Sequence, residues 1–265
     1  MYTVLISVAA AVAVGYFSAG EWGYVWGVIC GFFALLVSQL AVGLILRGRI
    51  MAGQQRIQEI MQQAQARIER QMNLYQIRPP ASMNAARQQL EKLQTAAARA
   101  ALAETDNFKR FYRWNFMMER QINAMKVQLY YQLKEYKMVD QLLPKAMLRD
   151  PQSMAIALVR SYRNGDESAI DRFYRRRCRS VKGESGAFLA SVYGWIKLKQ
   201  GNRSAAHEAL VAAGKHSDHP VLLENIDKLK NGKEKQYSMG GFGDMWYALA
   251  LEEPKVKAQR RRQMY

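Results

Sequence analysis

The stretch "LASVYGWIKLKQGNRSAAHEALVAAGKHSDHP" (residues 189–220) contains two apolar, helix-like segments on either side of the polar turn "KQGNRS". Similar segments fill residues 108–250, separated by "KEYK", "RDPQS", "RNGDES" and "KGESG", and none alternates as a half-buried strand does. One helix pair cannot bury its apolar face alone, so it is expected to stack on neighbours. The sequence therefore predicts an all-α fold built from stacked helix pairs.

The same stretch resembles the tetratricopeptide repeat family, whose unit is a helix–turn–helix of about 34 residues. The resemblance rests on a small residue where the two helices pack closely, a turn glycine, and a small, large, small series in the second helix: Gly194, Gly201, Ala206, Leu210 and Ala213. Lys197 stands where the family usually has an aromatic residue, and Pro220 comes about two residues late.

Two further units are predicted upstream. Residues 130–151 carry aromatic residues at the expected places, a similar helix series and a terminal proline: Tyr130, Tyr136, Val139, Leu143, Ala146 and Pro151. A poorer unit between them has Gly165 in its turn, followed by Ile170 and Tyr174. The resemblance implies a TPR-like α-solenoid of about three degenerate units within residues 104–250, with a concave surface that binds peptides or proteins.

The first 46 residues contain no Lys or Arg, and Glu21 is their only acid. The apolar runs at about 3–18 and 24–46 are long enough to cross a bilayer as helices, with "AGEWG" as the turn between them. The alternative is a cleaved signal peptide, but the leading "MY" lacks the positive charge of such a segment. Residues 1–47 are therefore predicted to form a transmembrane helical hairpin.

The charges beside the second span predict its orientation. Arg47, Arg49 and Arg56 follow that span, whereas the turn carries no Lys or Arg. Because basic flanks stay in the cytoplasm, both termini and the soluble body are expected there. The sequence thus predicts an integral membrane protein, of the inner or plasma membrane if the source is bacterial.

Residues 48–103 are predicted to form a coiled-coil-like stalk that is broken at Pro79-Pro80, with Ser82 capping the second helix. The first helix has the stripe Ile57, Met61, Ala64, Ile68 and Tyr75, which the polar Gln71 interrupts. The second has the seam Met83, Ala86, Leu90, Leu93, Ala97 and Ala100. An antiparallel hairpin and a dimeric coiled coil both fit this pattern, so the oligomeric state stays open.

The sequence offers little chemistry. His216, Asp218 and His219 have no further metal-ligating cluster beside them, and a polar loop explains them better than a metal site. Cys178 lies among arginines that could lower its thiol pKa, but no motif links a histidine to it. The segment "DMWYALALEEP" (244–254) is expected to pack against the body rather than to dock a partner. We therefore expect no enzyme activity, no cofactor and no metal.

The chain has a formal net charge of +17. Its densest positive stretches are residues 172–182 and residues 255–263, the latter within a basic C-terminal tail (251–265). The basic patch is Arg172, Arg175, Arg176, Arg177, Arg179, Arg260, Arg261 and Arg262. A solvated face, attraction to anionic lipid and nucleic-acid binding are the three interpretations. The sequence favours lipid over nucleic acid, because no nucleic-acid-binding motif is present.

These patterns together predict a membrane-anchored adaptor or scaffold, of the kind that serves as an assembly factor, with a protein partner on the cytoplasmic side. The predicted partner-binding residues lie on the first helices of the units: Tyr130, Lys134, Arg160, Arg163 and Lys197. Their basic character favours an acidic partner segment. The alternative is a membrane-tethered binder of nucleic acid or anionic lipid.

Overall fold

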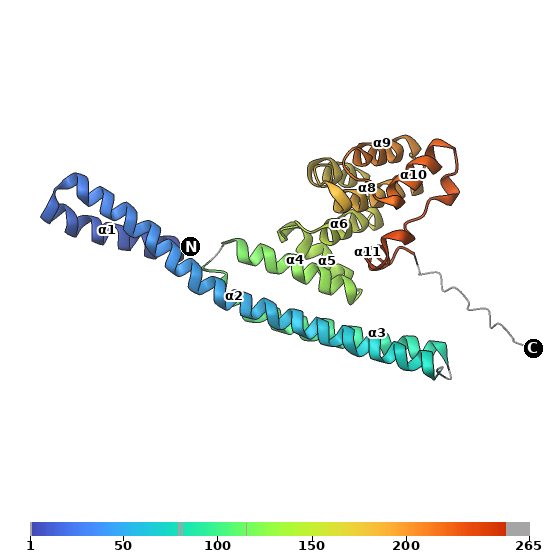
Figure 1. The fold of residues 1–265 in the computed structure, drawn as a ribbon, viewed down its shortest axis with the longest axis horizontal. Coiled ribbons are helices and arrows are strands. Elements are labelled where there is room, and N and C mark those ends of the chain that lie inside the picture. Colours follow the sequence, from blue (N-terminus) through green and yellow to red (C-terminus); the bar gives the residue numbers. More distant parts are fainter. Residues whose placement is uncertain (1, 79, 81, 115, 253–265) are drawn as a thin grey trace, which may run out of the picture. The chain divides into compact units, whose positions relative to one another are not determined.

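The computed structural model describes residues 2–78, 80, 82–114 and 116–252, and all regular secondary structure in these ranges is helical (Figure 1). The predicted all-α class is therefore confirmed. The chain divides into two compact units, Met1–Met147 and Leu148–Tyr265. This division falls inside the range 104–250 that the sequence assigns to one repeat domain, because the first helix pair of that range packs with the stalk.

The chain begins with two apolar helices, α1 (Tyr2–Trp22) and α2 (Tyr24–Ile77). Both are long and apolar enough to cross a membrane, and only 6% of each apolar window is buried. The turn is tighter than the predicted "AGEWG". Gly23 alone interrupts the helices, at a φ of 91° that glycine adopts without strain.

Small residues line the contact between α1 and the start of α2, which run antiparallel (Figure 1). A Cβ atom added to Gly27 would lie 2.6 Å from the Ala19 Cβ, and one added to Gly31 would lie 2.9 Å from the Ala11 carbonyl oxygen. Close backbone approach of this kind is typical of helix pairs in membranes, where van der Waals packing holds helices together.

Helix α2 continues without a break past the predicted end of the second span, and α3 (Met83–Thr105) packs back along it. The Ser82 hydroxyl accepts a hydrogen bond from the Ala85 N–H at 3.5 Å, as predicted for a cap. The predicted stripe on α2 faces α3, since its residues are buried or half-buried. On α3 the predicted seam is wrong at both ends. Met83 and Ala100 are exposed, and Ala101 is buried instead, because a straight helix drifts from a seven-residue repeat.

The core of the first unit lies where α2 and α3 meet η1 (Asp106–Phe111) and α4 (Phe116–Gln132). Its buried members are Ile57, Ala98, Ala101, Phe108, Phe111, Met118, Ile122 and Leu129. The stretch 108–125 therefore joins α4 to the stalk. Helices α5 (Tyr136–Leu142) and η2 (Leu143–Lys145) complete the unit by packing on α4.

The second unit is built around α8 (Gly183–Lys199), which is buried on all sides from Gly186 to Lys197. Its neighbours are α6 (Pro151–Arg163), α9 (Arg203–Gly214), α10 (Pro220–Lys230) and the π-helical turn η3 (Tyr174–Cys178) that continues α7 (Glu167–Phe173). Three short elements follow: η4 (Glu234–Gln236), η5 (Gly240–Phe242) and α11 (Asp244–Tyr247). An all-round apolar helix is stable only under such complete cover.

One turn geometry recurs after α4, α6, α8 and α10. The left-handed residues are Lys134, Gly165, Gly201 and Gly232, with φ between 60° and 78°. In each turn the left-handed residue and the residue after it donate N–H bonds back to the last helical turn, as in Asn202 N–H to Lys197 O at 2.8 Å. This is the Schellman arrangement, and it reverses the chain at the end of each of these helices.

Replacing Gly201 by alanine is expected to destabilise the second unit by about 1 kcal/mol, because a Cβ is strained at this φ although nothing lies within 4 Å of it. Urea unfolding of the full chain in detergent measures this loss. Gly201→Asn is the matched control, since asparagine tolerates the left-handed region and should recover most of the stability. Equal losses for both variants would contradict the explanation.

Candidate partner-binding surface and basic cluster

The five predicted partner-binding residues fall in both units. In the first, Tyr130 is half-buried on α4, and Lys134 is exposed in the left-handed turn. The Lys134 ammonium lies 2.6 Å from the Glu91 carboxylate of α3, and this contact lowers the pKa of Glu91. Both partners are more than half exposed, so the ion pair contributes little stability.

In the second unit, Arg160 and Arg163 lie in the last turn of α6, where positive charge complements the helix dipole. Arg163 is exposed, and Arg160 is half-buried with its guanidinium 3.2 Å from the Asn164 side-chain oxygen. Lys197 lies differently, because its side chain is 5% exposed and its ammonium contacts the Asp171 carboxylate at 2.7 Å. Lys197 therefore has a structural part in the unit and is no longer assigned to a contact surface.

The Asp171 carboxylate of α7 binds two side chains of α8. Besides Lys197, the Tyr193 hydroxyl donates to its carboxylate at 2.8 Å, and the Tyr193 ring stacks on Tyr174 with centroids 3.9 Å apart. Burial of the carboxyl by itself raises the pKa of Asp171. The hydrogen bonds from Lys197 and Tyr193, with the positive charges of Lys197 and Arg175, outweigh burial and leave that pKa below the ordinary 3.8. The network thus favours the charged carboxylate.

The basic patch is exposed where the structure describes it, at Arg172, Arg175, Arg176, Arg177 and Arg179. The π-helical turn η3 turns Tyr174 and Cys178 inward and leaves the three arginines between them in solvent. The remaining predicted members, Arg260, Arg261 and Arg262, lie outside the described residues.

Cys178 does not have the lowered pKa that its arginine neighbours suggested. The side chain is buried, and burial raises the pKa of its thiol to about 12. The arginines point into solvent, so they do not compensate for the loss of hydration around the sulfur. Cys178 and Cys30 are both free thiols.

The segment after α10 covers one face of α8. The Tyr237 hydroxyl donates to the Ser191 carbonyl at 2.8 Å, and the Phe242 ring meets Phe188 edge-on at 5.5 Å. Ser238 is held by two hydrogen bonds to the Asn225 side chain of α10, at 2.8 and 3.1 Å. These contacts account for the apolar character of α8 on this side.

Glu252 closes the cover through two tryptophans. The Trp195 indole N–H donates to one carboxylate oxygen at 2.9 Å and the Trp246 indole N–H to the other at 3.3 Å. The two indoles also meet edge-on, 5.5 Å apart, and Trp246 and Leu249 are fully buried. The prediction that residues 244–254 pack against the body is confirmed as far as residue 252, although the helix is a single turn.

The histidines of the loop before α10, His216 and His219, are not placed as metal ligands. His219 stacks on Phe242 with centroids 4.4 Å apart, at the start of α10. Among residues 2–78, 80, 82–114 and 116–252, no group of three His, Cys, Asp or Glu side chains is placed to hold a metal ion.

The sequence analysis missed two contacts, the Asp171–Lys197 ion pair and the hydrogen bond from Trp195 to Glu252. Their members are 26 and 57 residues apart, so no local pattern pairs them. A signal for the first did exist. Lys197 is the one charged residue in the apolar run "GAFLASVYGWIK" (186–197), which implies that it is buried, and a buried lysine requires a carboxylate.

Comparison of the chain with protein-family models, with curated proteins and with solved structures returned no match.

Proposed function

We propose that this protein is an integral membrane adaptor whose TPR-like helical stack binds a protein partner on the cytoplasmic side. The proposal rests on a contrast in burial between the two N-terminal helices and the second unit. The apolar windows of α1 and α2 are almost wholly exposed, whereas α8 in the second unit is buried on every side. Such exposed apolar surface requires cover, and a bilayer provides it.

The repeat assignment is supported by the recurrent turns. The left-handed residues 134, 165, 201 and 232 are separated by 31, 36 and 31 residues, close to the period of about 34 residues in tetratricopeptide repeats. The contacts are also those of a stack, since α8 touches the first helix α6 and the second-helix turn η3 of the preceding pair, and α10 touches α8 and α9. Helix stacks of this kind commonly bind proteins along one face.

The partner surface that the second unit leaves open is the end of α6. The face of α8 near Trp195 is covered by the chain's own residues 237–252, so it is not open to a partner. Arg163 is exposed on α6 with the half-buried Arg160 beside it, and their charge suits an acidic segment. Tyr130 and Lys134 belong to the proposed surface of the first unit.

The test is affinity capture with the full chain in detergent, washed at low and high salt, with and without nuclease. We expect one protein to survive high salt and nuclease, and Arg160→Glu with Arg163→Glu to reduce its capture at least tenfold. Lys233→Glu with Lys235→Glu is the matched control, because it makes the same charge change at exposed positions of the same unit. Equal loss in both variants would contradict a surface at α6.

The second candidate function is a membrane-tethered binder of anionic lipid or nucleic acid, which the five exposed arginines of the basic patch favour. Its mark is a steep loss of binding with salt. If only nucleic acid is captured, or if all capture ends at high salt, this candidate replaces the adaptor.

A further inference from the structure

The segment "FKRFYRW" (108–114) returns to the point where the two apolar helices end. The Tyr2 N–H donates to the Arg113 carbonyl at 3.1 Å, and the Tyr2 ring meets the Trp114 ring edge-on with centroids 5.6 Å apart. At the other end of the segment, the Phe108 ring lies against Gly53 of α2, where an added Cβ would be 2.5 Å from the ring. The segment thus meets α2 at a residue 55 positions away in the chain, and the start of α1 at a residue 111 positions away.

The helix geometry gives the depth of this segment relative to a bilayer. Gly53 is seven residues past Leu46, so Phe108 lies about 10 Å beyond the apolar span along α2. Because α1 lies antiparallel with Ala11 opposite Gly31, Tyr2 is level with about residue 40 of α2. The segment therefore runs from about 10 Å beyond Leu46 to about 9 Å inside it, where α1 begins at Tyr2, and so crosses the level of the headgroup layer, which is roughly 5–8 Å thick.

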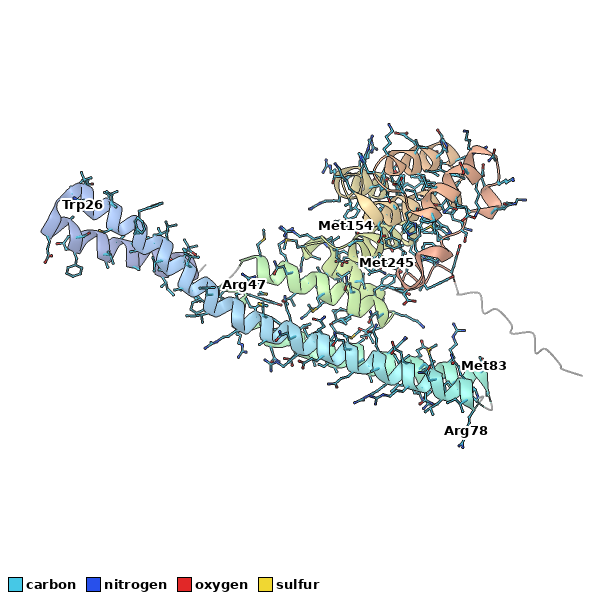
Figure 2. The ribbon with its side chains drawn as sticks, viewed as in Figure 1. Trp26, Arg47, Arg78, Met83, Met154 and Met245 are labelled. Atoms are coloured by element: carbon cyan, nitrogen blue, oxygen red, sulfur yellow. The ribbon has the colours of Figure 1, made fainter. Side chains whose placement is uncertain are left out.

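Four arginines lie near this level, and the acid from the neighbouring helix α4 is Glu119. Burial and, after it, the charge of Glu119 raise the pKa of Tyr112. Arg47 and Arg49 are exposed on α2, and Figure 2 shows Arg47 just past the part of α2 that pairs with α1. Arg110 and Arg113 are exposed on the returning segment, with the Arg110 guanidinium 4.8 Å from the Phe111 ring centre. Within 106–114 the acid is Asp106, whose carboxylate contacts the Lys109 and Lys126 ammonium groups at 3.1 Å.

We propose that Arg47, Arg49, Arg110 and Arg113, flanked by Tyr2 and Trp114, form a collar around the membrane exit that binds the phosphate headgroups of anionic lipids. The proposal rests on the membrane insertion proposed above. Guanidinium groups pair with phosphate through parallel hydrogen bonds, and tryptophan and tyrosine favour the headgroup level. The collar also explains why arginines lie both on α2, just past its apolar span, and on the returning segment, although only the α2 pair is visible in the sequence pattern.

The test places the full chain in nanodiscs of phosphatidylcholine, with or without about one third phosphatidylglycerol, and measures its thermal unfolding midpoint by near-UV circular dichroism. We expect the anionic lipid to raise the midpoint by about 4 °C or more. Arg110→Gln with Arg113→Gln should abolish this rise and leave the midpoint in phosphatidylcholine unchanged. Arg175→Gln with Arg176→Gln, which removes the same charge from the basic patch, should retain the rise.

Three outcomes would overturn the collar: no rise for the wild type, an equal loss of the rise in both variants, or the same rise from inorganic phosphate added to phosphatidylcholine discs. If Arg110→Gln with Arg113→Gln also lowers the midpoint in phosphatidylcholine, a second pair, Arg47→Gln with Arg49→Gln, is measured, because it leaves the returning segment intact. Loss of the rise in this second pair supports the collar, and a full rise contradicts it. Alkaline carbonate extraction of membranes distinguishes failure of the lipid-binding collar from failure of the proposed membrane anchoring. A chain released by carbonate is not anchored at all, whereas a retained chain without lipid preference refutes the collar alone.

Discussion

Replacing Asp171 by alanine is expected to lower the free energy of unfolding of the second unit by about 3 kcal/mol. The Lys197 ammonium would remain almost fully buried without its carboxylate at 2.7 Å, and the Tyr193 hydroxyl would lose its acceptor. The value lies at the low end for a broken buried pair, because the Asp171 side chain is 34% exposed and water reaches it. Urea unfolding of the full chain in detergent, followed by near-UV circular dichroism, measures the loss.

The double variant Asp171→Ala with Lys197→Met separates the charge from the packing. Methionine keeps most of the aliphatic volume of lysine and leaves no charge to hydrate, so it should restore most of the lost stability. A double variant as unstable as Asp171→Ala would show that the carboxylate acts through Tyr193 and not through Lys197.

The same pair gives a pH dependence with a fixed sign. The pKa of Asp171 is lowered in the folded chain, so its contribution is complete above the ordinary value of 3.8 and is lost as pH falls below it. The difference in stability between the wild type and Asp171→Ala is therefore expected to shrink below pH 3.8. Unfolding measured at pH 7 and at successive values below 3.8 tests this, and a constant difference would contradict it.

Replacing Trp246 by alanine is expected to cost about 4 kcal/mol. The indole is fully buried against Trp195, and its loss leaves a large cavity over α8 and removes one of the two donors to Glu252. Met245→Ala is the matched control, since Met245 precedes Trp246 in the same helical turn and its side chain is 38% exposed. Thermal unfolding of the full chain in detergent compares the two, and similar losses would mean that Trp246 does not anchor the segment.

Local sequence patterns predicted the features that depend on residues close together in the chain. The apolar stripe from Ile57 to Tyr75 and the Ser82 cap follow from helix periodicity and from one hydroxyl beside a helix start. The turn glycines Gly165 and Gly201 are likewise local, because few other residues adopt their φ without strain.

Contacts between segments that are far apart in the chain could not be predicted from the sequence. Lys134 takes the left-handed position that glycine takes in the other turns, and no pattern distinguishes it from an ordinary exposed lysine. The burial of Lys197 removed one of the predicted partner-binding residues, because periodicity assigns a helix face but does not identify the ion pair that lets a charge lie there. The return of residues 108–114 to Tyr2 depends on α3 folding back along α2, which leaves no trace in either segment alone.

The unbroken course of α2 has a mechanical consequence. One helix of 54 residues carries both the second apolar span and the first half of the stalk, a length of about 80 Å. With its apolar span inserted in a bilayer as proposed, such a helix would tilt as one rigid rod. Its 31 residues beyond Leu46 extend about 46 Å, so a change of about 10° in helix tilt would displace the distal tip of the stalk by about 8 Å. A change of membrane thickness that altered the tilt of the inserted span would thereby move the tip of the stalk mainly sideways over the membrane surface.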